Sequence, residues 1–157
     1  MRTDVSKFNN VGECVSYGAH GGQLVPIPAT LVLTAPTVIG TPQCWAGATA
    51  GFTPILPALW NSGTFNNPGA ILWFQADGNL VIYAAGHVGD PAYAPWNTGT
   101  FGNPDAFLVL QGDGNLVIYN STVTLALWNS GTNGHPGDCV LFQTDGNLVI
   151  YAGCTIP

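Results

Sequence analysis

The sequence contains very little charge, and almost none of it is positive. Asp, Glu, Lys and Arg make up only 6 % of its 157 residues, against about 25 % in an ordinary soluble domain. No Lys or Arg follows Lys7. Because phosphate backbones and anionic membrane surfaces are bound by clustered cations, we expect neither a nucleic-acid nor a membrane-surface partner. With a formal net charge of −6, a neutral hydroxylated ligand or another protein is the expected partner.

Long hydrophobic runs and helix-forming residues are also scarce. Apolar residues make up 46 % of the chain, but no run approaches the roughly 18 apolar residues that cross a bilayer, so we expect no membrane insertion. The 21 Gly and 12 Pro favour short strands joined by many turns. The composition therefore predicts an all-β protein.

The four cysteines lack the spacing of a metal site. They are Cys14, Cys44, Cys139 and Cys154, with no Cys-x-x-Cys pair and no His at a ligand offset, so we expect no metal and no cofactor. An even count predicts two disulfides and an extracellular, secreted protein. The opening stretch MRTDVSKFNN lacks the apolar core of a secretion signal. This leaves three alternatives: a signal removed beforehand, another export route, or reduced thiols.

One nine-residue motif occurs three times and organises the chain. It reads QADGNLVIY at residues 75–83, QGDGNLVIY at 111–119 and QTDGNLVIY at 143–151. A Trp stands fifteen residues before each leading Gln, at Trp60, Trp96 and Trp128, which gives repeat periods of 36 and 32 residues. Such a period predicts a repeat architecture in which no single unit can bury its own apolar face.

Each unit is expected to form three or four short strands. Asp-Gly within the motif predicts a hairpin turn between two of them. Alternation along the following strand should turn its Leu and Ile inward, at positions 80, 82, 116, 118, 148 and 150. The Asn, Val and Tyr of the same strand should then face outward, with Gln and Asp beside them.

The two ends of the chain depart from this pattern. Residues 1–55 do not carry the repeat, and six Pro residues from Pro26 to Pro57 interrupt the chain, so we interpret 1–55 as an extended β arm with strands near 23–27 and 30–34. Residues 56–157 form the repeat domain. Its last unit lacks a Trp strand, which the strand around Trp60 should supply; a neighbouring molecule is the alternative.

The repeated polar side chains suit sugar binding better than catalysis. Gln, Asp, Asn and Tyr offer donors and acceptors together, and Val offers a small apolar surface. A glycosidase needs two carboxylates about 5 to 10 Å apart, whereas each unit supplies one, and we therefore expect no enzyme. The candidate site residues are Gln75, Asp77, Asn79, Val81, Tyr83, Gln111, Asp113, Asn115, Val117, Tyr119, Gln143, Asp145, Asn147, Val149 and Tyr151.

Two alternatives concern the roles of these residues. Asp-Gly-Asn can recur because it makes a good turn, and Gln and Tyr can bind each other across a hairpin; turn chemistry alone gives no reason for Val and Tyr at fixed offsets. The three repeated Trp residues are expected in the core rather than as sugar platforms. Trp73 stands where the other units have Val109 and Leu141, so it is a candidate extra contact beside the first site.

The triplicate pattern Gln-x-Asp-x-Asn-x-Val-x-Tyr resembles the monocot mannose-binding (bulb-type) lectin family over about residues 56–154. The resemblance implies a β-prism II fold, with three four-stranded antiparallel sheets around a pseudo-three-fold axis and the Trp residues near its centre. It also implies a mannose site on each sheet. In such a site Asp and Asn would bind the axial 2-hydroxyl, Gln the 3-hydroxyl and Tyr the 4-hydroxyl, while Val would touch the ring carbons.

Several features depart from that family. The first 55 residues have no counterpart in it, and the cysteines do not occupy its usual disulfide positions. We predict the pairs Cys14–Cys44 and Cys139–Cys154, although alternation places Cys139 and Cys154 on opposite faces unless the chain bends after Gly153.

The sequence thus predicts a lectin that binds terminal α-mannose on glycans through three metal-independent sites. The alternative is a self-assembling extracellular structural or adhesive protein, in which the arm or an exchanged strand joins copies into a homo-oligomer or polymer.

Overall fold

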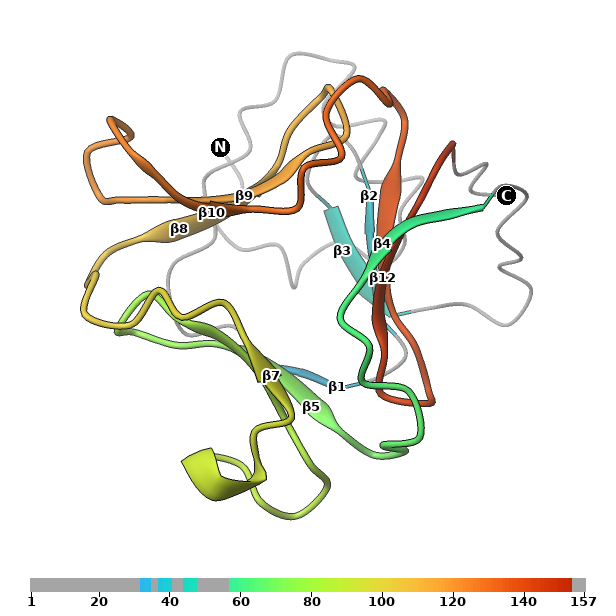
Figure 1. Ribbon diagram of the computed structural model, residues 1–157, viewed down its shortest axis with the longest axis vertical. Helices are drawn as coiled ribbons and strands as arrows, with labels where there is room; N and C mark the ends of the chain where they lie inside the picture. Colours follow the sequence, from blue (N-terminus) through green and yellow to red (C-terminus); the bar gives the residue numbers. More distant parts are fainter. Residues whose placement is uncertain (1–31, 35–36, 41–43, 48–56, 154–157) are drawn as a thin grey trace.

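The computed structural model of the chain describes residues 32–34, 37–40, 44–47 and 57–153. Side chains are described for 57–153. In these ranges the chain forms twelve short strands and one 3-10 helix, arranged as three antiparallel sheets around a common axis (Figure 1). The expectation of an all-β prism is confirmed.

Each repeat motif forms the hairpin that Asp-Gly predicted. The hairpins are β5 (Ile71–Phe74) with β6 (Leu80–Tyr83), β8 (Phe107–Leu110) with β9 (Leu116–Tyr119), and β11 (Cys139–Phe142) with β12 (Leu148–Tyr151). A Trp strand adds to the second strand of each hairpin: β7 (Trp96–Asn97), β10 (Ala126–Asn129) and β4 (Ala58–Asn61) respectively. β7 is the shortest of these strands, because Pro95 before it has no N–H to donate.

The first Trp strand closes the ring of repeats. β4 pairs with β12 from the far end of the repeat region, with Trp60 opposite Ile150. The predicted completion of the third sheet by the Trp60 strand is therefore found within one chain. Figure 1 shows β4 and β12 side by side, although about ninety residues separate them in the sequence.

The N-terminal segment contributes outer strands to two of the sheets. β1 (Val32–Thr34) pairs with β5, while β2 (Thr37–Gly40) pairs with β11 and β3 (Cys44–Gly47) with β2. The sheets therefore contain four, three and five strands among the described residues, and not four each as the resemblance implied. The difference arises because strands of the arm, and not of the repeats, extend the sheets. The expected strand near 23–27 lies outside the described residues.

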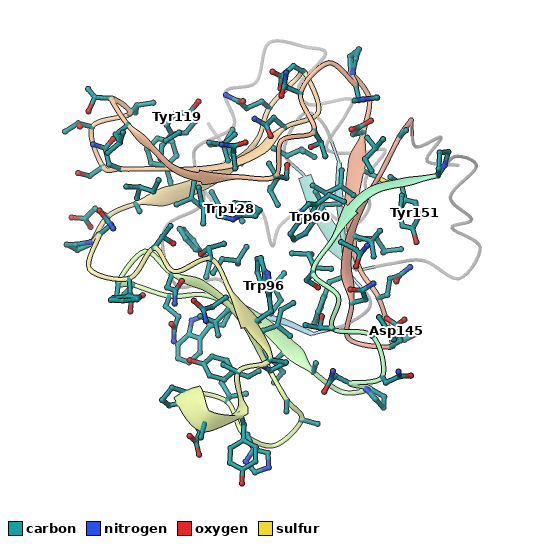
Figure 2. The ribbon with its side chains drawn as sticks, in the orientation of Figure 1. Trp60, Trp96, Tyr119, Trp128, Asp145 and Tyr151 are labelled. Atoms are coloured by element: carbon teal, nitrogen blue, oxygen red, sulfur yellow. The ribbon has the colours of Figure 1, made fainter. Side chains whose placement is uncertain are left out.

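The core lies between the three sheets. The inward Leu and Ile of the three motif strands are 0–1 % exposed, as alternation predicted; they are Leu80, Ile82, Leu116, Ile118, Leu148 and Ile150. On the axis the rings of Trp60, Trp96 and Trp128 meet edge to face, with centroids 5.6, 5.6 and 5.9 Å apart (Figure 2). Edge-to-face contact is a preferred aromatic geometry. The repeated Trp residues are therefore core residues.

Two further features bear on the sequence predictions. Cys139 is buried and disulfide-bonded, but the side chain of its partner is not among those described, so both predicted pairs stay predictions. In the part of the chain that the structure describes, no helix has the length and apolar character to cross a membrane. Its one helix is the short η2 (Pro91–Tyr93).

Candidate binding sites

The motif side chains lie on the outer face of each sheet, away from the Trp axis. The Leu and Ile of each motif strand belong to the core cluster and the Val and Tyr between them do not, as alternation requires. Figure 2 shows Tyr119, Tyr151 and Asp145 on the outside of the prism, with the Trp residues at its centre. The structure thus brings each Gln, Asp, Asn, Val and Tyr set together on one face, three times over.

Gln and Tyr are joined in the same way in every unit. The side-chain Nε2 of Gln75 donates to the hydroxyl of Tyr83 at 3.0 Å, and the equivalent distances are 2.9 Å at Gln111 and 2.8 Å at Gln143. The pair spans the hairpin from the end of one strand to the end of the next. A bond between Gln and Tyr was one explanation that the sequence offered for their fixed spacing in the three repeats. The bond fixes the orientation of both side chains.

Asp holds the turn and keeps one carboxylate oxygen outward. Oδ1 of Asp77 accepts from the backbone N–H of Asn79 at 3.0 Å, and the same bond is 3.1 Å at Asp113 and 3.0 Å at Asp145. All three Asp side chains are exposed. Their Oδ2 atoms have no hydrogen bond to the described part of the protein. The carboxylate therefore has both a turn-forming oxygen and one available to a ligand.

The Gly after each Asp lets a neighbouring loop approach the turn. We call this loop, which follows each Trp strand at residues 62–70, 98–106 and 130–138, the Trp loop. Gly114 has φ +90, and a Cβ there would collide with the carbonyl oxygen of His135. The N–H of His135 in turn donates to the carbonyl of Asp113 at 2.9 Å. Only Gly permits this approach without strain. The equivalent collisions at Gly78 and Gly146 are with the carbonyls of Asn103 and Asn67.

Asn clamps the Trp loop with its side-chain oxygen. Oδ1 of Asn79 accepts from the backbone N–H of Thr100 at 3.2 Å and from Oγ1 of Thr98 at 3.1 Å. Oγ1 of Thr100 then donates to the carbonyl of Gly78 at 2.7 Å. Asn115 and Asn147 make the equivalent bonds. The Nδ2 group of each Asn has no hydrogen-bond partner within the described residues and so remains available as a donor.

Val is more deeply buried than alternation suggested. Val81, Val117 and Val149 face outward but are each only 2 % exposed. Each lies in the middle strand of its three, with a neighbour on both sides: Val81 stands opposite Trp73 and Asn97. The apolar surface that Val offers a ligand is therefore smaller than the sequence suggested. Val instead forms the floor between the polar side chains.

The remaining donors and acceptors define what each site can do. Every site combines an exposed carboxylate oxygen, an amide donor from Asn and the oxygen of the Gln amide. The hydroxyl of its Tyr accepts from Gln and so directs its own proton elsewhere. A pyranose with neighbouring hydroxyl groups matches such a mixture of donors and acceptors. No group of three His, Cys, Asp or Glu in the described ranges lies close enough together to hold a metal ion.

The sequence analysis missed the residues that attach the Trp loop to the site. These are the Ser or Thr two residues after each Trp and the buried Thr four residues after it, at positions 62, 64, 98, 100, 130 and 132. Their signal was present, because the phrase Trp-Asn-Ser/Thr-Gly-Thr repeats at a fixed offset.

Comparison with known proteins finds similar solved structures. No protein-family model matches the sequence, and no curated protein matches it significantly. The mannose-specific bulb lectin of bluebell, Scilla campanulata, is similar with a TM-score of 0.51 and 26 % identity, over 77 % of this chain and 95 % of that one. The repeat region has the β-prism II fold of the monocot bulb lectins.

A second bulb lectin from bluebell is similar to this chain over part of the lectin's own length. The two-domain fetuin-binding agglutinin is 27 % identical with a TM-score of 0.50, over 62 % of this chain. The match spans 51 % of that longer lectin. Both of these neighbours are lectins.

Proposed function

We propose that this protein is a non-enzymatic lectin that binds terminal α-mannose on glycans through its three motif sites. The observation that carries the proposal is the threefold recurrence of one hydrogen-bond arrangement. In each unit Gln is bound to Tyr, Asp to the turn and Asn to the Trp loop. A scaffold role accounts for those bonds, but not for the acceptors and donors that all three units leave on the same outer face.

Each site offers a single exposed carboxylate, which supports binding and not hydrolysis. Asp77, Asp113 and Asp145 belong to three different sheets. A pair of carboxylates is what glycoside hydrolysis requires. The sites are on an open face and should be weak singly. Glycans that reach several sites, or several copies of the chain, gain about 10²- to 10⁴-fold in avidity.

The test is a calorimetric or NMR titration with methyl α-mannoside, with methyl α-glucoside as the comparison. The null protein carries Asp→Asn at positions 77, 113 and 145, because Asn keeps the Oδ1 acceptor of the turn and removes the charge. Asp105→Asn is the matched control: Asp105 is an exposed Asp with φ 62, a conformation that Asn tolerates, and it lies outside the motifs. Mannose binding that survives in the triple variant would refute the proposed sites.

A second candidate function, self-assembly through the arm, has one observation behind it. Strands β1 and β2 pair with β5 and β11 through their backbones, and pairing of this kind is readily exchanged between identical copies. Removal of residues 1–55 discriminates. A lectin keeps its sugar binding and its mass in solution, whereas an arm-linked extracellular polymer falls to monomers.

A further inference from the structure

The side chain at position 73 and the loop after Tyr83 distinguish the first of the three sites from the others. Its β5 strand carries Trp73 where the other units have Val109 and Leu141. Its connection from Tyr83 to the next Trp is four residues longer than that of the second unit, which accounts for the longer first repeat period. Both differences fall on the same unit.

Trp73 lies directly beside the binding face. It stands opposite Val81 across the β5–β6 pair, so its side chain is on the outer face with the motif side chains. Its ring centroid is 6.2 Å from that of Tyr83, with the planes tilted by 54°. The side chain is only half-buried. An indole surface therefore extends the first site along β5, from Gln75 toward the start of that strand.

The longer connection, residues 84–95, folds back toward that indole. A Cβ built on Gly89 would lie 4.0 Å from Cζ3 of Trp73, so the loop backbone passes close to the ring. Figure 1 shows the loop with η2 at the outer end of the first sheet. The loop backbone at Gly89 thus borders Trp73 at the edge of the first site.

The loop is held in shape by its own bonds. Backbone N–H of Ala84 donates to the carbonyl of Tyr93 at 2.9 Å, and Oδ1 of Asp90 accepts from Ala92 N–H at 3.0 Å. The rings of His87 and Tyr93 stack with centroids 3.8 Å apart. Tyr93 is nevertheless 49 % exposed. The loop therefore presents aromatic and polar groups to solvent in a fixed arrangement.

We propose that Trp73 and the loop 84–95 form a second subsite, which binds the sugar residue next to the terminal mannose. The inference rests on the proposed function. A pyranose has an apolar face of C–H groups that packs on an indole ring, while His87 and Tyr93 supply hydrogen-bonding groups for its hydroxyls. The first site then selects oligosaccharides of α-linked mannose over the single sugar. The sites with Val109 and Leu141 lack the indole and take the terminal residue alone.

The experiment isolates the first site. Asp113→Asn and Asp145→Asn silence the other two, and affinities for methyl α-mannoside and for an α-linked mannotriose are compared by titration. We expect the trisaccharide to bind about three- to tenfold more tightly than the monosaccharide. The side-chain indole N–H of Trp73 should shift in NMR spectra with the trisaccharide and not with methyl α-mannoside.

Trp73→Val separates the subsite from the primary site. The second unit carries Val at this position in the same strand register, so the substitution fits the fold. It should remove the trisaccharide preference and leave monosaccharide affinity unchanged, while the control Leu141→Val in the silenced third unit changes neither. Tyr93→Ala should lower the preference without abolishing it.

The outcomes separate the two proposals. Equal affinity for mono- and trisaccharide in the isolated site overturns the subsite and leaves the lectin standing. Loss of monosaccharide and trisaccharide affinity by the same factor in Trp73→Val also overturns it, because Trp73 would then support only the primary site. No binding of either sugar by the isolated site overturns the subsite, and no binding of either sugar by the wild-type protein overturns the proposed function as well.

Discussion

Gln75 donates its side-chain amide to the hydroxyl of Tyr83 at 3.0 Å, and the bond recurs in both other units. Its direction decides what each group can offer a ligand. The Tyr oxygen accepts from Gln, so its proton points elsewhere, and the Gln oxygen is turned away from Tyr. The hydrogen bond between Gln and Tyr therefore also orients the Tyr donor and the Gln acceptor on the binding face.

Tyr119→Phe tests this pairing in the second unit. The substitution removes the acceptor of the Gln111 amide and a donor to the sugar. Because the pair is part-buried, we expect a loss of about 0.5 to 1.5 kcal/mol in the free energy of unfolding. Sugar binding at the second site should be lost, while the other two sites keep theirs. Denaturant unfolding and NMR titration measure the two effects; an unchanged second site would contradict the role of Tyr119.

Gly114→Ala should be strongly destabilising, because φ there is +90 and a Cβ would meet the carbonyl oxygen of His135 and the carboxylate of Asp138. We expect a loss of about 2 kcal/mol or more. Gly112→Ala in the same hairpin is the matched control, since nothing lies within 4 Å of a Cβ at that position. Thermal unfolding of both variants gives the comparison. Equal stabilities would mean that the loop does not close on the turn as described.

Asp138 occupies a slot that the other units fill with Ala70 and Ala106, each 1 % exposed as Asp138 is. Burial raises the pKa of its carboxyl, against smaller lowering effects of the Gly153 N–H and of His135. Oδ2 has no hydrogen bond among the described residues. Relative to the unfolded chain, the folded protein therefore holds this proton more tightly, and the charged form costs stability.

The pH dependence follows from the direction of that shift. Between the ordinary pKa of 3.8 and the raised value, the folded state keeps a proton that the unfolded state has lost, so stability falls as pH rises through this window. Asp138→Ala removes this decrease in stability with pH. The gain in unfolding free energy of the variant over wild type should be about 1 to 3 kcal/mol larger at neutral pH than in acid. The measurement is the difference in unfolding free energy between variant and wild type at about pH 3 and pH 7. A difference that does not change with pH would contradict the burial of this charge.

Much of the fold was predictable because its determinants are local and occur three times. Asp-Gly specified the hairpins, and alternation placed Leu116 and Ile118 in the core. The missing last Trp strand indicated that Trp60 closes the ring. These inferences need only the spacing of residues within one unit.

What was not predictable depends on neighbours distant in the sequence. The burial of Val81 comes from side chains on two adjacent strands, which the pattern of its own strand does not contain. The clamp from Asn79 to Thr100 joins residues 21 positions apart. The distribution of arm strands over two sheets depends on backbone pairing, which carries little sequence signal.

The claim that three equivalent sugar sites exist is tested most directly by NMR. Side-chain amide signals of Gln75, Gln111 and Gln143 are followed in ¹⁵N-labelled protein during titration with methyl α-mannoside. The account predicts that all three signals shift, and that a single Asp113→Asn substitution removes only the shift of Gln111. Shifts confined to residues outside the motifs, or none at saturating sugar with the fold intact, would contradict it.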